Sequence, residues 1–250
     1  MYSSATTIKH YARASAWLLW GVTLIAAAEP GTQHHTGCAY DLNSGRLLYT
    51  EAHVQRWEGD RNLGGTVAYY DPQGQQIAAK TLDFSVDPQV PVYRLEIPDQ
   101  RYTEGITDHR DTIILARASR DGGQQSKRIN RKSPIAADAG TLQFVQTNFE
   151  ALLKGEVLRL RLAVASRLDV YSVRIRRAME NEADGQPVVR FRIEHDSPLR
   201  LLLDPVEMTY DRQSRRLLEY RGTSNMRDSS TGDAYTVRIT YTPDLARCPS

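Results

Sequence analysis

An excess of charge of one sign is missing from most of this sequence. The 250 residues include 32 Lys and Arg and 30 Asp and Glu, but two of the bases, Lys9 and Arg13, lie in the first 28 positions, which contain no acid. Setting those two aside leaves 30 basic residues against 30 acidic ones. Nonspecific binding to nucleic acid depends on neutralising phosphates, so this balance argues against a nucleic-acid partner.

Motifs that carry chemistry are missing as well. There is no G-x-S-x-G, no H-E-x-x-H and no phosphate-binding glycine loop. His195, Asp196 and Ser197 are adjacent, but catalytic triads converge in space and not in sequence, so a hydrolase is the least supported reading. The histidines after residue 28 are mostly scattered: His34, His35, His53, His109 and His195. We therefore expect no catalytic residues, no cofactor and no metal site, which would need three or four converging ligands.

A long apolar run occurs once, at the start of the chain. Ala16–Ala28 (AWLLWGVTLIAAA) follows Lys9 and Arg13 and ends in an A-x-A pattern at Ala26 and Ala28. This layout predicts a secretory signal peptide over residues 1–28 and a periplasmic mature chain; an uncleaved anchor helix or a buried helix is the alternative. The run is short for a bilayer, and no other segment comes near, so we expect no transmembrane span after cleavage.

Only two cysteines are present, Cys38 and Cys248, close to the two ends of the mature chain. An oxidising compartment permits a disulfide between them, and two unpaired thiols on frayed ends are the alternative. Polar residues separate Cys38 from Ala28, so we interpret Cys38 as not lipidated.

The mature sequence has the pattern of many strands. Asp71-Pro72-Gln73-Gly74 is a turn with Pro in its second position, and it predicts a hairpin between 66–70 and 76–84. Apolar and polar residues alternate over 158–164, 171–176, 189–194 and 235–241, as in strands with one packed and one wet face. Residues 29–250 are therefore predicted to form a single all-β, mainly antiparallel domain with a curved sheet or half-barrel; a β-sandwich is the alternative.

One segment breaks this alternation. Apolar residues spaced three or four apart predict one covering helix near 141–154, with Thr141 capping its start and Gly155 its end: Leu142, Val145, Phe149, Leu152 and Leu153. The polar and basic stretch from Gln124 to Ser133 is interpreted as an exposed loop.

The alternating strands provide two sets of candidate site residues. The apolar set either fills a core or lines a cavity: Leu160, Val173, Ile175, Phe191 and Ile193. The polar set either binds an anion or is a solvated face paired with acids, and its main members are Arg159, Arg174, Arg190 and Arg192, joined by Arg161, Arg176 and Arg238.

Several segments resemble a family of uncharacterised secreted proteins of Gram-negative bacteria: Ala39–His53, Ala78–Ser85, Phe149–Leu168 and Asp204–Asp228. The resemblance covers nearly the whole mature chain and implies a location but no activity. The long antiparallel sheet with short helical cover is also similar in architecture to the periplasmic lipoprotein-carrier half-barrels. That likeness implies an acyl chain held in the concavity of the sheet.

The sequence leads to two function hypotheses besides the hydrolase. The first is a periplasmic binding or carrier protein for a hydrophobic or anionic amphipathic ligand such as a lipid, with the apolar set lining the site and arginines at its rim. The alternative is an envelope structural or adaptor protein that binds a partner through its Arg-rich face. The identity of the ligand or partner and the oligomeric state are left open.

Overall fold

The computed structural model describes residues 31–108, 112–183, 186–198, 204–243 and 248–249. The predicted signal peptide and His109 lie outside these residues. The first eight strands are β1 (Gly31–Asp41), β2 (Leu47–Glu58), β3 (Arg61–Tyr70), β4 (Gln76–Asp83), β5 (Val92–Ile97), β6 (Tyr102–Asp108), β7 (Thr112–Ser119) and β8 (Gly123–Asn130). The others are β9 (Ile135–Ala137), β10 (Leu158–Val164), β11 (Asp169–Ala183), β12 (Gln186–His195), β13 (Val206–Asp211), β14 (Leu217–Arg227) and β15 (Ala234–Pro243).

The described strands form one sheet of two antiparallel halves joined in its middle. Its order is β8-β7-β6-β5-β4-β3-β2-β1-β15-β14-β13-β12-β11-β10-β9, so each strand pairs with its neighbour in sequence except at the central seam, where β1 pairs with β15. Within this order the β9–β10 pair alone is parallel. The hairpin predicted around Asp71–Gly74 is confirmed, since β3 and β4 pair antiparallel. In the turn between them, the Asp71 carboxylate accepts hydrogen bonds from the backbone of Gln73 and Gln75.

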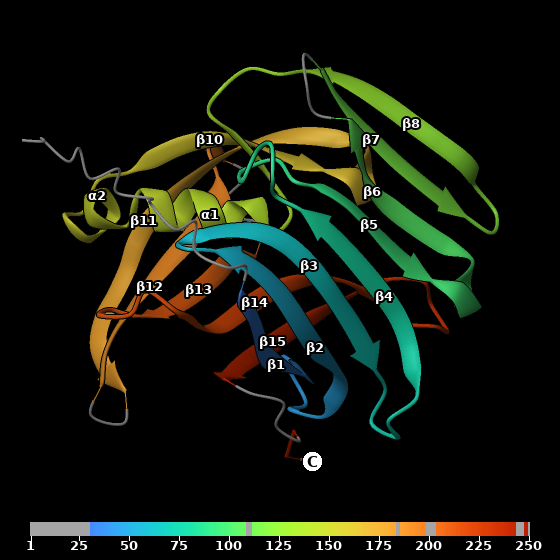
Figure 1. Cartoon of the computed structure of the whole chain (residues 1–250), viewed down its shortest axis with the longest axis horizontal. Helices are drawn as coiled ribbons and strands as arrows, with labels where there is room; N and C mark the ends of the chain where they lie inside the picture. Colours follow the sequence, from blue (N-terminus) through green and yellow to red (C-terminus); the bar gives the residue numbers. More distant parts are fainter. Residues whose placement is uncertain (1–30, 109–111, 184–185, 199–203, 244–247, 250) are drawn as a thin grey trace, which may run out of the picture.

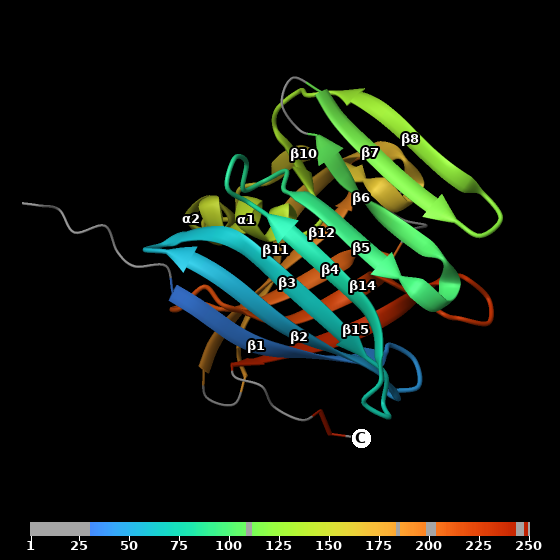
Figure 2. The same ribbon diagram turned by 45° about the vertical axis from the view of Figure 1, so that its right-hand side comes forward.

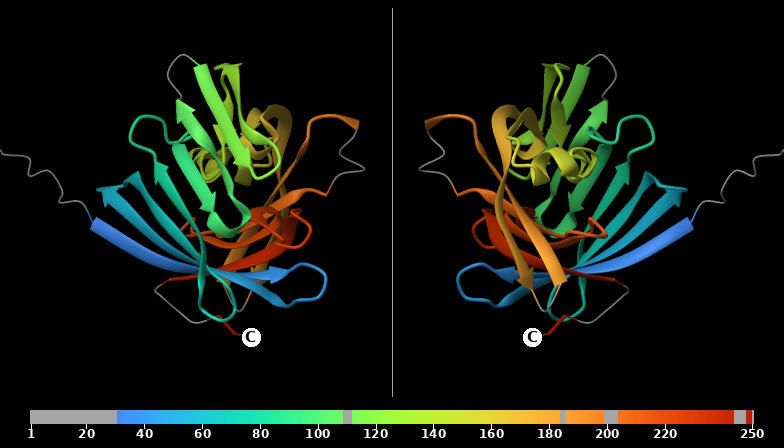
Figure 3. Two further views of the ribbon diagram at one scale, coloured as in Figure 1. Left: turned by 90° about the vertical axis from the view of Figure 1, so that its right-hand side faces the viewer. Right: turned by 90° about the vertical axis from the view of Figure 1, so that its left-hand side faces the viewer.

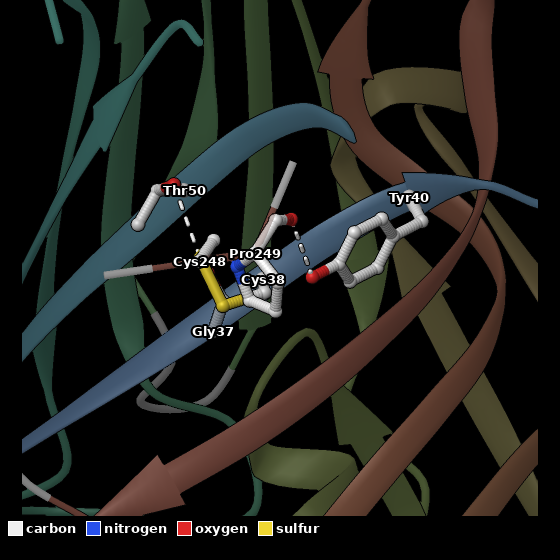
Figure 4. The surroundings of a disulfide bond; sticks show 6 residues. All are labelled: Gly37, Cys38, Tyr40, Thr50, Cys248 and Pro249. Atoms are coloured by element: carbon white, nitrogen blue, oxygen red, sulfur yellow. Dashed lines mark hydrogen bonds between the residues drawn. A yellow bond between two sulfur atoms is a disulfide. The ribbon is translucent and has the colours of Figure 1, made fainter. Parts of the chain in front are cut away.

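The central seam also carries the predicted disulfide, which the structure confirms. Cys38 of β1 lies beside Thr240 of β15 and bonds to Cys248, 210 residues further along the chain. Figure 4 shows the end of the chain lying against β1, where the Thr50 hydroxyl donates to Cys248 Sγ over 3.3 Å. The Tyr40 hydroxyl donates to the carbonyl of Pro249 over 3.1 Å.

The sheet curves around two short helices, α1 (Gly140–Thr147) and α2 (Phe149–Leu153), which lie inside it (Figures 1 to 3). We call the side that faces these helices the inner face and the opposite side the outer face. Close strand approach accompanies the bend: a side chain on Gly65 would lie 1.9 Å from the carbonyl oxygen of Val54 on the next strand. The all-β curved sheet predicted from the alternation is thus confirmed.

The predicted helix near 141–154 is present but broken at Asn148 into α1 and α2. The expected cap at Thr141 is wrong, since α1 begins one residue earlier and Thr141 is buried in its first turn. The expected end is confirmed: Gly155 has a φ of +89°, and its N–H donates to Leu152 while that of Glu156 donates to Ala151. This double hydrogen bond is the glycine-dependent end that stops a helix. No helix of the described residues has the length and apolar content to cross a membrane.

The two ends of the sheet meet through side chains. An apolar cluster joins β5–β8 to the region of β9 and β10, with members Val90, Tyr93, Ile106, Ile113, Leu115, Ile129, Ile135, Ala137, Ala163 and Ala165. Lys127 of β8 also pairs with Asp169 of β11 at 2.7 Å. The prediction of a loop over Gln124–Ser133 is wrong for its first part. That part belongs to the edge strand β8, which is largely exposed and pairs on one side with β7.

Candidate functional site

The apolar candidates lie on the inner face, packed against the helices. Leu160, Val173, Ile175, Phe191 and Ile193 are all buried in one core cluster with residues of α1 and α2. The rings of Phe149 and Phe191 meet edge to face, with their centroids 5.2 Å apart. The inner face at these positions therefore belongs to a core that includes helical side chains.

The arginine candidates lie on the outer face of the same strands, so the structure does not bring the two sets together. Arg159 pairs with Asp196 at 2.9 Å, Arg174 with Glu194 at 2.5 Å, and Arg192 with Glu207 at 2.5 Å. Arg190 also pairs with Glu207, at 3.5 Å. A shallow hollow of about 190 Å³ lies beside Arg159, Arg161 and Asp196 near Pro134.

These arginines belong to a row of charges that crosses the outer face from β10 to β15. Neighbouring strands place Arg176 beside Arg192, Arg192 beside Glu207, Glu207 beside Arg221, and Arg221 beside Arg238. Burial raises the pKa of Glu194, but the hydrogen bonds from Arg174 and Arg176 together lower it by more. The pKa of Glu194 therefore lies below its usual range. In this half of the described sheet seven arginines pair with four acids, which leaves an excess of positive charge: Arg159, Arg174, Arg176, Arg190, Arg192, Arg221 and Arg238, with Glu194, Asp196, Glu207 and Glu219.

Two polar clusters, which the sequence did not reveal, lie on the inner face. In the first, the Lys80 cluster, Lys80 Nζ lies 2.6 Å from both carboxylate oxygens of Asp138. Asn225 Nδ2 donates to Asp138 over 2.9 Å and to Glu104 over 3.0 Å, and the Tyr102 hydroxyl donates to Glu104 over 2.5 Å. Desolvation raises the pKa of Glu104, although the hydrogen bond from Tyr102 opposes it. Because Asn225 comes from β14 and Lys80 from β4, the cluster links the two halves of the sheet across its interior.

The second, the Glu51 cluster, lies nearer the central seam. Glu51 Oε2 is 2.8 Å from His53 Nε2, and the His53 ring stacks on His35 at 4.1 Å. The Tyr241 ring meets both imidazoles edge-on, at 5.9 and 6.1 Å. Gly37 makes room for this arrangement, since a side chain there would lie 2.8 Å from Glu51 Oε2 and 2.9 Å from the ring of Tyr241.

Tyrosines fill the space around Glu51. Burial is the largest cause that raises the pKa of Tyr49, Tyr69 and Tyr241, and the negative charge of Glu51 is the next. The pKa of Tyr220 is raised by burial, then by Asp138 and then by Glu51. Tyr220 and Tyr241 nevertheless keep part of their surface exposed. Tyr220 and Tyr241 are thus only partly covered, although burial is the largest cause that raises the pKa of each hydroxyl group.

The sequence contains a signal that would have found these clusters. Lys80 stands between Ala78 and Leu82 in the apolar register of its strand, and Glu51 and Glu104 occupy corresponding positions in theirs. A charge in an apolar register is a buried charge that needs partners. Asp138 and Asn225 carry no such signal, because the first lies between β9 and α1 and the second follows a break in strand register.

Comparison with known proteins gives a structural likeness and no match in sequence. In the part of the chain that the structure describes, no three His, Cys, Asp or Glu side chains are grouped as metal ligands. No family model matches the sequence, and no curated protein matches it. A solved β-barrel-like protein of the domain of unknown function DUF1849, from Brucella abortus, is similar over 89% of this chain and 100% of its own, at 9% identity and a TM-score of 0.40.

Proposed function

We propose that this chain is a binding protein that takes an amphipathic molecule on the inner face of its sheet. The observation that carries the proposal is the partial exposure of Tyr220 and Tyr241 on a face whose charged groups Glu51, Lys80 and Glu104 are buried. Ligand sites in proteins are mostly apolar or aromatic, with a few polar groups that orient the ligand. The Glu51 cluster provides such groups beside these two rings.

We assign the apolar part of the ligand to the boundary between two core clusters of the inner face. Tyr220 packs against both of them: one formed with α1 and α2, and one formed by β1–β6 with β14 and β15. Leu142, Val206 and Leu217 lie half-buried at the margin of the first cluster. The five apolar residues predicted from the sequence are buried in the first cluster, where they pack with residues of the helices.

The proposed location is the periplasm. It rests on the signal-like pattern of residues 1–28, and the Cys38–Cys248 disulfide is compatible with an oxidising compartment. In this setting a lipid or another amphipathic envelope component is the proposed ligand.

Titration with n-decyl-β-maltoside, a neutral amphiphile, below its micellar concentration tests the proposal. We expect saturable binding by calorimetry, and a loss of about five- to ten-fold in affinity in Tyr220→Ala, which removes an aromatic contact. Arg221→Ala, on the next residue and the opposite face, is the matched control and should bind like the unaltered protein. Absence of saturable binding by the folded protein, or equal losses in both variants, would contradict the proposal.

A second function is supported by the excess of arginine over acid on the outer face. We propose that this row binds the acidic surface of a partner protein. A decamer of aspartate is the probe: it should bind at low salt and lose most of its affinity in the double variant Arg192→Glu, Arg221→Glu. Arg94→Glu, on the exposed β5 pair with Glu96, is the control. Equal binding by all three proteins would remove this second function.

A further inference from the structure

Glu51 is a carboxylate held away from water on the inner face. Its side chain is 8% exposed, and it lies over Gly37 with His53 as its hydrogen-bonded neighbour. Burying a carboxylate is costly unless a positive or hydrogen-bonding group accompanies it. A cation that approached Glu51 would therefore gain more from the attraction than at an exposed carboxylate.

The aromatic rings around Glu51 are of the kind that attract such a cation. Tyr49 lies 5.9 Å from Tyr69, ring to ring, and the Tyr241 ring lies 5.9 Å from His53. Aromatic faces attract ammonium groups within about 6 Å, and several rings together form the cages that bind alkylated ammonium. Among the described residues, protein cations lie over Tyr40, Tyr93, Tyr102 and Phe149, and none lies over the tyrosines around Glu51.

Three basic side chains of the inner face, Lys80, Arg227 and His35, would not compete with a cation for Glu51. The ammonium group of Lys80 is bound to Asp138, and Arg227 lies over the ring of Tyr102 at 4.5 Å. Burial, followed by repulsion from His53, lowers the pKa of His35 to about 3, so His35 is neutral near neutral pH. Among the described residues, the basic side chain that pairs with Glu51 is His53.

Two members of the cluster are partly exposed. His53 and Tyr241 keep part of their surface exposed, whereas Glu51, Tyr49 and Tyr69 are buried. A small head group that passed His53 and Tyr241 would meet the carboxylate, and the remainder of the ligand would extend toward Tyr220.

From this arrangement we propose that the Glu51 cluster binds an organic ammonium group, and that this group is the head of the amphipathic ligand. The carboxylate of Glu51 provides the charge, and the rings of Tyr49, Tyr69 and Tyr241 provide the cation–π surface. The inference rests on the proposed binding function and adds the chemical class of the head group.

Three decyl amphiphiles that differ in charge test the inference: decyltrimethylammonium, n-decyl-β-maltoside and decyl sulfate, each below its micellar concentration. We expect the ammonium probe to bind about ten-fold more tightly than the maltoside, and the sulfate more weakly than both. Choline chloride, which has the same head and no tail, separates two sources of the chemistry. Binding of choline alone with high affinity indicates a free amine, and binding that needs the tail indicates a lipid-like ligand.

The variant Glu51→Gln keeps the size of the side chain and removes its charge. It should reduce the preference for ammonium over maltoside to about two-fold or less while maltoside binding stays within about two-fold. Glu219→Gln, an outer-face carboxylate, should retain the full preference. If Glu51→Gln does not fold, Tyr241→Leu replaces it, with the same loss of preference expected.

The outcomes separate this inference from the function on which it rests. Equal affinity for the three probes, or an ammonium preference that survives in Glu51→Gln, overturns the ammonium site and leaves the binding function standing. Failure of all three decyl probes to bind the folded protein overturns the binding function itself.

Discussion

Lys80 and Asp138 form an ion pair inside the curved sheet, with Lys80 Nζ 2.6 Å from the carboxylate and each side chain less than a tenth exposed. Lys80 belongs to β4, while Asp138 precedes α1. Asn225 of β14 donates a hydrogen bond to the same carboxylate. The pair therefore connects one half of the sheet, the helical cover and the other half in a single buried network.

Removing one partner of this pair should destabilise the fold strongly. At residue 138 the backbone φ is +48°, which asparagine adopts readily, so Asp138→Asn should not strain the backbone. It leaves the ammonium group of Lys80 buried without its counter-charge. We expect a loss of about 3–5 kcal/mol in the free energy of unfolding, measured by urea denaturation. Lys127→Met, which breaks the half-exposed pair with Asp169, should cost less than about 1 kcal/mol. Similar losses in the two variants would show that Lys80 does not depend on Asp138.

The disulfide should contribute much of the stability of the chain. It joins residues 210 positions apart, and the chain-entropy model assigns a loop of that length up to about 5 kcal/mol. Denaturation with and without reductant should differ by an amount approaching this limit. Intact mass after alkylation under non-reducing conditions should show no modified cysteine, and free alkylation of both would contradict the bond.

Gly37 is predicted to be intolerant of even a methyl group. In Gly37→Ala the new carbon would lie within 3 Å of both Glu51 Oε2 and the Tyr241 ring, so both must move. We expect a loss of about 1–3 kcal/mol in stability and a weaker preference for the ammonium probe. Gly45→Ala, at a turn with open space and a φ of +72°, tests backbone strain alone and should leave that preference intact.

His35 should make stability fall as the pH drops below neutral. Its pKa is about 3 in the folded protein and about 6.5 when unfolded, so between these values the unfolded chain binds the extra proton. The stabilisation is thus complete above about pH 6.5 and is lost progressively toward pH 3. Between pH 7 and pH 5 we expect a loss of about 2 kcal/mol that His35→Phe, which keeps a ring against His53, does not show. Parallel pH profiles for the two proteins would contradict it.

The strands and the sides of the sheet could be predicted because both follow from local alternation. Leu160 and Val173 point inward and Arg159 and Arg174 outward, as the period of two requires. The pattern fails where a strand is polar on both faces. For this reason the sequence pattern predicts a loop at the edge strand β8, which is held in place by hydrogen bonds to β7 and not by burial.

The candidate site was less accessible to sequence reasoning because it depends on convergence. Glu51 and Glu104 are visible as single charges in apolar registers, but their strands are separated in the sheet by three others. Nothing local indicates that Asn225 would reach Glu104 from a strand more than a hundred residues away. The pairing of β1 with β15 brings the two halves of the sheet, and with them Glu104 and Asn225, together. This pairing joins the two ends of the described sheet sequence, so no local pattern reveals it.

The seam between β1 and β15 also has a consequence for the order of folding. Neighbouring strands within each half can pair as soon as both have been made, but the pairing that joins the two halves needs the last strand together with the first. This pairing joins residues that lie far apart in the sequence and so raises the contact order of the chain. A high contact order is typical of slow folding. Because Cys38 lies beside Thr240 in that seam, the oxidation of the two cysteines reports that the sheet has been completed.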